Sequence, residues 1–188
     1  GAYIGHNIKD FTLKNCLGEE VVLHGGCGQS RALWIFATTG WCSACATILN
    51  TMASDYGGYL SRKIIGEVRP GLDMLVVLSQ DSDYGEPDLE TCIEYAESHK
   101  LDPAMLVLDH NPAGVKIPMM EPIGETHTYE GMATTWSHIN PYLVEENGGV
   151  QNLYPWNALL RGSNMEYFWS DNCGVSNHET ALEKLLSE

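Results

Sequence analysis

The sequence predicts an α/β fold in which buried parallel strands alternate with helices. Three continuous apolar runs carry this prediction, at residues 32–37, 74–78 and 104–108. Runs of this length are typical of strands that are covered on both faces. Segments in which apolar residues recur at helical spacing separate the three runs, and that alternation indicates a parallel core.

Size and composition agree with a globular protein and disfavour several classes of partner. The chain has 188 residues, of which 44% are hydrophobic and 19% charged, so we expect a single domain over residues 1–188 with a substantial core. The formal net charge of −15 disfavours nucleic acid and anionic lipid as partners. No apolar run approaches the roughly 18 residues that a membrane helix needs, so we expect no membrane insertion within this chain.

Residues 1–30 are expected to form an N-terminal extension that contains a β-hairpin. Short strands are predicted at residues 11–13 and 21–23, and the turn-like residues 15–18 separate them. The first buried strand of the core follows directly after this extension.

Two helices are predicted between the three buried strands. From Ser43 to Leu60 the apolar residues follow helical spacing, with a break or bend at Gly57 and Gly58. A second helix is expected over residues 88–101.

Residues 111–150 differ in character from the core and are predicted to be an insertion. They are rich in proline and glycine and hold no long periodic segment, although one short helix is expected within residues 134–143. Long loops in compact domains tend to be functional, so we expect the insertion to lie near Pro155 and to influence which substrate docks.

After the insertion, the sequence predicts a β-hairpin and a closing helix. The two strands are expected at residues 157–160 and 165–169, with a turn at residues 161–164. Ser176 and Glu179 form a capping box at the start of the final helix, which carries an apolar stripe.

The motif that carries chemistry is the pair Cys42 and Cys45, which follows the first buried strand and begins a helix. A helix N-terminus offers free backbone N–H groups and the positive end of the helix dipole, both of which stabilise a thiolate. We therefore expect the pKa of Cys42 to lie below the free value of about 8.5 and Cys42 to be the attacking thiol. Cys45, one turn deeper and more shielded, would resolve the mixed disulfide.

This spacing of two cysteines has three interpretations: a zinc site, a structural disulfide and a redox pair. A zinc site needs two more ligands, and the chain has no second Cys-x-x-Cys and no paired histidine motif. A static disulfide at the exposed mouth of a strand–helix junction stays open as an alternative. The setting between a strand and a helix N-terminus favours the redox pair.

Some of the other four cysteines, Cys16, Cys27, Cys92 and Cys173, are expected to form structural disulfides in an oxidising compartment. An even count of six cysteines favours such a compartment. Cys16 and Cys27 flank the predicted first hairpin, so a bridge between them is expected to close a loop of about a dozen residues. Cys92 lies on the apolar face of its helix, where it is either a buried free cysteine or bridged to Cys173.

The residues around the cysteine pair resemble the thioredoxin superfamily. Residues 41–45, Trp-Cys-Ser-Ala-Cys, follow a buried strand and precede a long helix. Gly5, Phe11 and Leu13 match the opening phrase of the redoxin branch, which comprises bacterial extracytoplasmic oxidoreductases related to the TlpA, ResA and AhpC/TSA types. The resemblance implies a thioredoxin-like fold with a central mixed sheet flanked by helices.

The same resemblance implies the substrate-binding residues and the function. Tyr154 and Pro155 occupy the place of the family's cis-proline, where the backbone of the preceding residue pairs with the substrate peptide. Trp41 and Trp156 are expected to form an apolar collar around the dithiol. The expected function is a thiol–disulfide oxidoreductase, periplasmic or otherwise extracytoplasmic, with reduction as the favoured direction. Its partners would be protein thiols and disulfides and an upstream electron donor, and no cofactor is expected.

The sequence departs from the family pattern in two ways that bear on mechanism. Ser43 and Ala44 between the cysteines supply neither a charge nor a proline, so they give no indication of the reduction potential. Neither the strand before the pair nor the helix after it shows a buried acid that could relay a proton for Cys45.

Two other activities stay open as alternatives. A thiol peroxidase needs a proline and a threonine ahead of its cysteine, and Thr39 fits the threonine whereas Ile35 stands at the proline position. A copper-binding module would use the cysteine pair together with a histidine, for which His127 and His138 in the insertion are candidates.

Overall fold

A seven-stranded sheet forms the centre of the computed structural model. The model describes residues 5, 7–8, 10, 12–109, 117–120, 126–129, 144–146, 149–151, 154–172 and 178–188. The seven strands are β1 (Thr12–Asn15), β2 (Glu20–Val22), β3 (Ala32–Thr38), β4 (Leu72–Leu78), β5 (Leu106–Leu108), β10 (Trp156–Arg161) and β11 (Glu166–Asn172).

The sheet is mixed, in the spatial order β11-β10-β3-β4-β5-β1-β2. The pairs β3–β4 and β4–β5 are parallel, whereas β10 runs antiparallel to β3 and β1 runs antiparallel to β5. The predicted parallel core and the predicted N-terminal hairpin, β1–β2, are both confirmed. The three apolar runs of the sequence are β3, β4 and β5, which occupy the middle of the sheet where both faces are covered.

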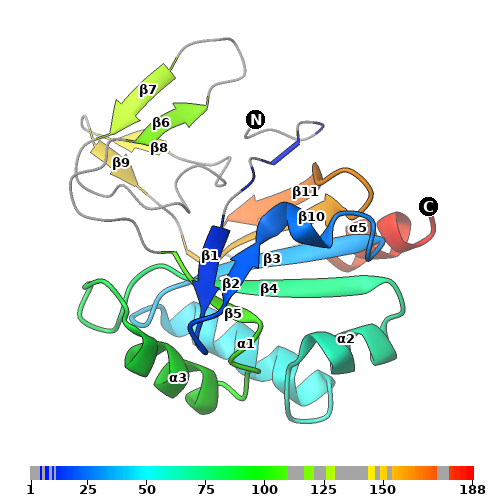
Figure 1. The fold of residues 1–188 in the computed structure, drawn as a ribbon, viewed down its shortest axis with the longest axis horizontal. Coiled ribbons are helices and arrows are strands. Elements are labelled where there is room, and N and C mark those ends of the chain that lie inside the picture. Colours follow the sequence, from blue (N-terminus) through cyan, green and yellow to red (C-terminus); the bar gives the residue numbers. More distant parts are fainter. Residues whose placement is uncertain are drawn as a thin grey trace.

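Four α-helices accompany the sheet: α1 (Ser43–Asp55), α2 (Arg62–Val68), α3 (Leu89–Ser98) and α5 (His178–Leu186). All four contribute to one hydrophobic cluster with the side chains of one sheet face, including Trp34 and Met74. The helical members of that cluster include Cys45, Leu49, Ile65, Cys92, Ala96, Leu182 and Leu185. In Figure 1, α1, α2 and α3 lie together on one side of the sheet.

The other sheet face has its own core cluster. Leu33, Ile35 and Val77 alternate with the helix-facing residues along β3 and β4, as the two-residue period of a strand requires. The short 3₁₀ helix η1 (Leu23–Gly26) and Ile8 cover part of this face. Two separate layers of apolar side chains therefore hold the central strands in place.

The helices differ from the sequence prediction between β3 and β4. Helix α1 ends at Asp55, and Gly57 and Gly58 then adopt positive φ angles of 85° and 95°. Glycine reaches such angles without steric cost, which explains the sharp stop. The separate helix α2 was not predicted, because Ile65 is its only buried residue and seven residues with one buried position give no apolar period.

The predicted insertion contains regular structure that the sequence did not indicate. Strands β6 (Ile117–Met120) and β7 (Thr126–Tyr129) form one antiparallel pair, and β8 (Val144–Glu146) and β9 (Gly149–Gln151) form another. The short helix predicted within residues 134–143 lies outside the described residues, as does Ser176 of the predicted capping box.

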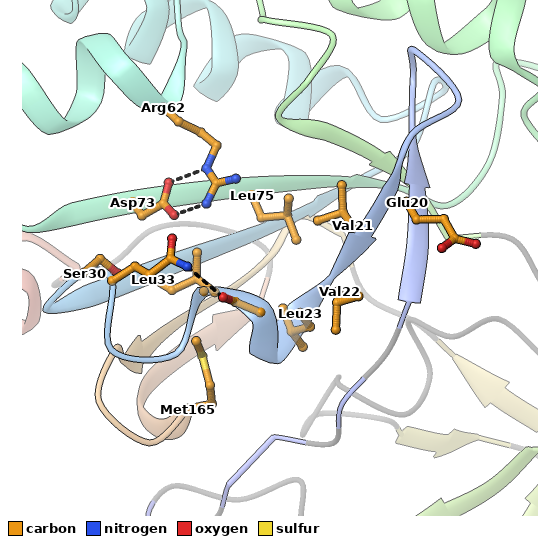
Figure 2. Close-up of a pocket in the computed structure, with 13 residues that line it drawn as sticks. Glu20, Val21, Val22, Leu23, Ser30, Leu33, Arg62, Asp73, Leu75 and Met165 are labelled. Atoms are coloured by element: carbon orange, nitrogen blue, oxygen red, sulfur yellow. Dashed lines mark hydrogen bonds and ion pairs between the residues drawn. The ribbon is translucent and has the colours of Figure 1, made fainter.

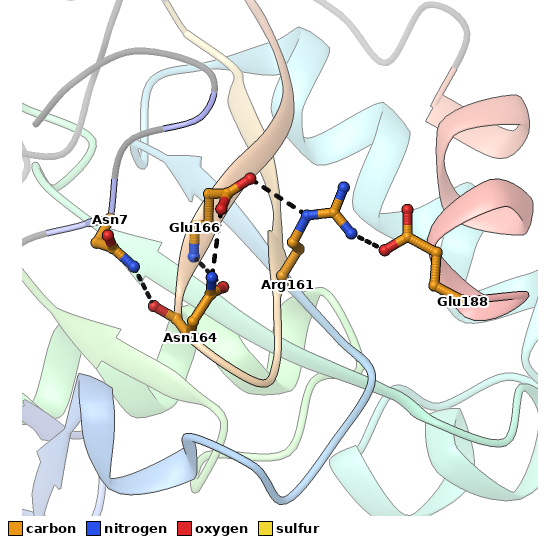
Figure 3. Close-up of polar contacts among 5 residues, drawn as sticks. All are labelled: Asn7, Arg161, Asn164, Glu166 and Glu188. Carbon is orange, nitrogen blue, oxygen red and sulfur yellow. Dashed lines mark hydrogen bonds and ion pairs between the residues drawn. The ribbon is translucent and has the colours of Figure 1, made fainter.

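The predicted C-terminal hairpin is β10–β11, and polar contacts tie it to both ends of the described chain (Figure 3). Arg161 donates from Nε to Glu166 at 3.2 Å, and its guanidinium also contacts the carboxylate of Glu188. The side-chain amide of Asn7 donates to the backbone carbonyl of Asn164. Partly exposed ion pairs of this kind contribute little individually, so they position the hairpin and add little to its stability.

The disulfide pairing differs from the expected one. Cys16 is bonded to Cys92 of α3, and Cys27 is a free, exposed thiol whose Sγ donates to the carbonyl of Ser163 at 3.1 Å. Cys16 belongs to the cluster on the helix face, whereas Leu23 of η1, four residues before Cys27, belongs to the cluster on the opposite face. Cys27 thus contacts the turn between β10 and β11, whereas Cys16 contacts α3. Cys173, the expected partner of Cys92, lies outside the described residues, and Cys92 is already occupied.

Candidate active site

Cys42 and Cys45 meet at the junction between β3 and α1. Cys42 is the N-cap residue of α1, and the two cysteines are joined by a disulfide across one helical turn. The backbone N–H of Cys45 donates to Sγ of Cys42 at 3.2 Å, as expected for a group at a helix N-terminus. Cys42 keeps 7% of its surface exposed and Cys45 none, so Cys42 is the residue of the pair that a partner can approach.

The fold fixes this junction from both sides. Strand β3 is paired along its whole length with β4 on one side and from Ala32 to Ala37 with β10 on the other. Helix α1 then buries Leu49, Met52 and Ala53 against the sheet. A sulfur pair on such rigid elements is held in one place.

A proline loop lies beside the disulfide. The Tyr154–Pro155 peptide bond is cis, and Pro155 is buried. Strand β10 pairs with β3 in a register that places Trp156 opposite Ala37. The two residues before Trp156 therefore extend past the last paired residue of β3, toward the loop that carries Cys42.

Three aromatic rings form a row next to Cys42, which we call the aromatic row: Tyr84, Trp41 and Tyr154. The Trp41 ring stacks on Tyr84 with centroids 5.1 Å apart and meets the edge of Tyr154 at 5.7 Å. The indole N–H of Trp41 donates to Gln80 Oε1 at 2.9 Å. Gln80 and Tyr84 come from the loop between β4 and α3, which sequence reasoning did not assign to the site. Their only signal in the sequence is their place after the carboxyl end of a parallel strand, at the same edge as Cys42.

The loop between β4 and α3 packs directly against Gly40. The N–H of Gly40 donates to the carbonyl of Gln80 at 2.8 Å, and a Cβ at Gly40 would lie 2.6 Å from backbone atoms of Asp81 and Ser82. No side chain fits there without moving the loop. Glycine at this position therefore allows Trp41 to reach its partners.

Replacing Gly40 with alanine should displace the loop and loosen Trp41. We expect the free energy of unfolding to fall by about 1–3 kcal/mol, which is the usual cost of overpacking, and the fluorescence of Trp41 to change. Urea unfolding followed by intrinsic fluorescence measures both. Gly25→Ala is the matched control, because a Cβ there would meet Val22 at an ordinary 3.5 Å. An equal, small effect of both substitutions would contradict the proposed tight packing.

Buried polar groups line the same edge of the sheet. Thr38 shares a hydrogen bond of 2.7 Å with the hydroxyl of Tyr95, and Ser79 donates to the Asp109 carboxylate at 3.5 Å. Burial raises the pKa of Tyr95 to about 12, with the hydrogen bond to Thr38 opposing, so its hydroxyl stays protonated at neutral pH. Asp109 directly follows β5, which is two strands from β3, and at about 4.8 Å per strand its backbone lies roughly 10 Å from that strand.

The structure brings together the site residues expected from the sequence, which are Cys42, Cys45, Trp41, Tyr154 and Pro155.

The expected role of Trp156 in an apolar collar around the dithiol is wrong. Its ring is fully buried in the cluster on the face opposite the helices, edge-on to Tyr167 at 6.4 Å. The alternation along β10 explains this, because Trp156 stands opposite Ala37, whose side chain points to that face.

In the part of the chain that the structure describes, no group of three or more His, Cys, Asp or Glu side chains could hold a metal ion. Of the two histidines considered for copper, His127 lies in β7 and His138 lies outside the described residues. Across the same described residues, no helix has the length and apolar character needed to cross a membrane.

A cavity of about 240 Å³ lies away from the disulfide (Figure 2). Its lining includes Val21, Leu33 and Leu75, beside the ion pair of Arg62 with Asp73. Leu33 and Asp73 are the second residues of β3 and β4, whereas Cys42 follows the last residue of β3. The cavity therefore opens at the opposite end of the strands from the sulfur chemistry.

Comparison with solved structures identifies the fold. A candidate protein disulfide isomerase from Bacteroides thetaiotaomicron matches with a TM-score of 0.61 at 14% identity, covering 100% of this chain and 92% of that one. A secreted disulfide oxidoreductase of Mycobacterium tuberculosis, homologous to E. coli DsbE, matches with a TM-score of 0.53 at 12% identity, covering 94% of each chain. Copper-bound ScoI of Arabidopsis thaliana matches with a TM-score of 0.53 at 14% identity, covering 97% of this chain and 99% of that one.

No protein-family model matches the sequence, and no curated protein matches it. The structural likenesses are nevertheless strong over the full chain, and the protein has a thioredoxin-like fold, as the sequence predicted. At these identities the likeness extends to the fold alone.

Proposed function

We propose that the protein is a thiol–disulfide oxidoreductase that reduces disulfides in protein substrates through Cys42 and Cys45. The observation that carries the proposal is the disulfide itself, at the N-terminus of α1 in a thioredoxin-like fold, with the exposed ring of Trp41 directly before it in the chain. A disulfide that only stabilises the fold does not need an exposed aromatic surface next to its sulfur. An enzyme that exchanges disulfides must bind a partner there.

The reaction starts from the reduced pair. The Cys42 thiolate, favoured by the N–H groups and dipole of α1, attacks one sulfur of the substrate disulfide. A bond forms between Cys42 and that sulfur, the substrate S–S bond breaks, and the other substrate sulfur leaves as a thiolate. Cys45, as a thiolate, then attacks Cys42 and releases the second substrate thiolate. Two electrons pass to the substrate, and the Cys42–Cys45 disulfide remains.

The geometry also suggests how the substrate is held. We place its backbone along Tyr154 and Pro155, because these residues extend beyond β3 toward Cys42. Trp41, with 36% of its surface exposed, provides an apolar contact beside the attacking sulfur. Completion of the cycle requires an upstream dithiol donor that reduces Cys42–Cys45 again.

We further propose that the protein works outside the cytoplasm, in the periplasm or a comparable oxidising compartment. The buried Cys16–Cys92 bridge supports this location, because structural disulfides persist mainly in such compartments. The secreted mycobacterial oxidoreductase with the same fold agrees with it.

Two alternatives have weaker support. Copper binding has the fold of ScoI in its favour, but a histidine ligand beside the cysteine pair is not among the side chains that the structure describes. For a thiol peroxidase, Ile35 is buried within β3 at the position where a proline is required. Disulfide exchange accounts for more of the site than either alternative.

The reduction potential of the Cys42–Cys45 pair tests the direction of the reaction. A reductase should have a potential closer to that of thioredoxin, about −270 mV, than to that of a strong oxidant, about −120 mV. Equilibration with glutathione buffers, followed by quantification of free thiols, measures the potential, and turnover with insulin as the disulfide substrate measures activity. A value near the oxidant end would contradict the reducing direction while leaving disulfide exchange intact.

A further inference from the structure

The aromatic row ends in a residue that the reaction as proposed does not use. Tyr84 is 67% exposed, yet its ring is stacked on Trp41. Its φ of 65° places it in the left-handed region, which is unfavourable for a non-glycine residue. An exposed aromatic residue in an unfavourable backbone conformation adds little to the stability of the fold. A role in binding a partner accounts for such a residue better.

The loop that carries Tyr84 is internally fixed. Asp81 Oδ1 accepts hydrogen bonds from the N–H groups of Asp83 at 2.8 Å and Gly85 at 2.7 Å. The N–H of Asp81 donates back to the carbonyl of Gly85 at 3.0 Å. Together with the contact to Gly40, these bonds hold the Tyr84 ring in one position beside Trp41. The aromatic row is therefore a preformed surface, which lowers the entropic cost of binding.

The charge around this surface is mainly negative, with Lys14 of β1 lining the same pocket as Glu86 and Asp88. The loop carries Asp83 next to Tyr84, and Glu86 and Asp88 follow before α3. Residues 32–61 and 70–99, which supply the disulfide and this loop, contain no lysine or arginine. The formal net charge of the whole chain is −15, so the electrostatic potential around the molecule is negative overall. Such a surface attracts cationic partners and repels acidic ones.

Aromatic faces add a second attraction for the same chemistry. Trp and Tyr rings bind the ammonium of lysine or the guanidinium of arginine over their faces, which strengthens binding by about 2- to 5-fold at exposed sites. Tyr84 and Trp41 offer such rings next to the exposed carboxylate of Asp83. Apolar stacking and charge thus favour the same partner.

We propose that Tyr84 and the acidic loop around it select protein substrates in which a lysine or arginine lies near the reacting cysteine. This inference rests on the proposed oxidoreductase function and adds substrate selection to it. A basic segment bound across Tyr84 and Trp41 places its neighbouring cysteine at Cys42, because Trp41 directly precedes Cys42 in the chain.

Two oxidised peptides test the proposal with the reduced full-length protein. Each peptide is a disulfide-linked dimer of the same short sequence, with the cysteine flanked either by two lysines or by two glutamates. At low salt the lysine peptide should oxidise the protein at least about 10-fold faster, because electrostatic steering changes association rates by that order. In about 0.5 M salt the ratio should approach one, since the screening length there is only a few ångströms.

Variants separate the aromatic part from the acidic part. Tyr84→Ala should slow the reaction with the lysine peptide by about 2- to 5-fold, the loss expected from one exposed cation–π contact. Asp83→Asn should lower the ratio between the two peptides. Tyr59→Ala and Asp55→Asn are matched controls at the far end of α1, some 18 Å of helix away, and should change neither rate.

The outcomes distinguish this inference from the function on which it rests. A small neutral disulfide, oxidised 2-mercaptoethanol, reports the chemistry of the cysteine pair alone. If the protein reduces this neutral disulfide but is oxidised at the same rate by both peptides at low salt, the proposed substrate selection is overturned. The proposed oxidoreductase function stands in that case. If the neutral disulfide does not react, both proposals fail. If Tyr84→Ala changes the molecular mass of the protein in solution and leaves both peptide rates unchanged, the surface around Tyr84 is a contact with a second copy of the chain. That result would overturn the proposed substrate selection.

Discussion

Replacing Cys42 with serine should reduce the turnover of insulin disulfides by at least about 100-fold, because a hydroxyl at this position cannot act as the thiolate nucleophile. Cys45 is fully buried whereas Cys42 keeps some exposed surface, so Cys45 is not expected to take over the first attack. The assay follows the precipitation of reduced insulin chains with a dithiol as the electron donor.

Cys45→Ser should have a different effect from Cys42→Ser. The first attack by Cys42 remains possible, but without the resolving thiol the enzyme stays bonded to its substrate. Mixed disulfides should accumulate on non-reducing gels and disappear when dithiol is added. Cys27→Ser is the matched control, because Cys27 is a free, exposed thiol outside the site, and it should leave turnover unchanged. Full insulin reduction by a variant lacking both Cys42 and Cys45 would refute the proposed function.

Removal of the Cys16–Cys92 bridge should cause the largest loss of stability. The two cysteines are 76 residues apart in the sequence, so the bridge closes a long loop in the unfolded chain. Loops of this size correspond to about 4 kcal/mol in the entropic estimate, and the measured range for native disulfides is about 2–5 kcal/mol. The bridge also fixes the turn after β1 to α3 through two buried side chains.

The double variant Cys16→Ala/Cys92→Ala tests this expectation by urea unfolding at neutral pH, without reductant. Its free energy of unfolding should fall by about 4 kcal/mol relative to the parent protein. Cys27→Ala removes an exposed thiol and should cost no more than about 0.5 kcal/mol. A loss below about 1 kcal/mol in the double variant would show that the bridge adds little, and would weaken the argument for an oxidising compartment.

Elements with a strong internal pattern were predictable from the sequence. The three buried strands are visible as apolar runs, and α1 and α3 are visible through helical spacing. Helix α2 has one buried residue, and the strands of residues 117–151 are only three or four residues long, so neither could be recognised by periodicity. Prediction failed where the elements were too short to contain a period.

The reactive cysteine pair of the candidate site was predictable from the sequence, whereas several residues around the pair were not. Cys42 and Cys45 are close in sequence, and their spacing at a strand–helix junction already indicates a redox pair. Gln80 and Tyr84 lie about forty residues later in a loop without a motif, and they reach Trp41 only because β3 and β4 are parallel neighbours. Trp156 was misplaced because its side of the sheet depends on the register of β10.

The sequence by itself determined the fold class, because the three apolar runs and the helical segments between them are each local patterns, and it determined the reactive pair, because both cysteines lie at the start of one helix. Only the tertiary structure decided which distant residues meet. It joined Cys16 to Cys92, because the turn after β1 lies next to α3, and it placed Cys27 against the turn between β10 and β11, where the segment after η1 bonds to residues 162–163. It also placed Tyr84 beside Trp41, because the parallel strands β3 and β4 end at the same edge, so the loops that follow them lie together.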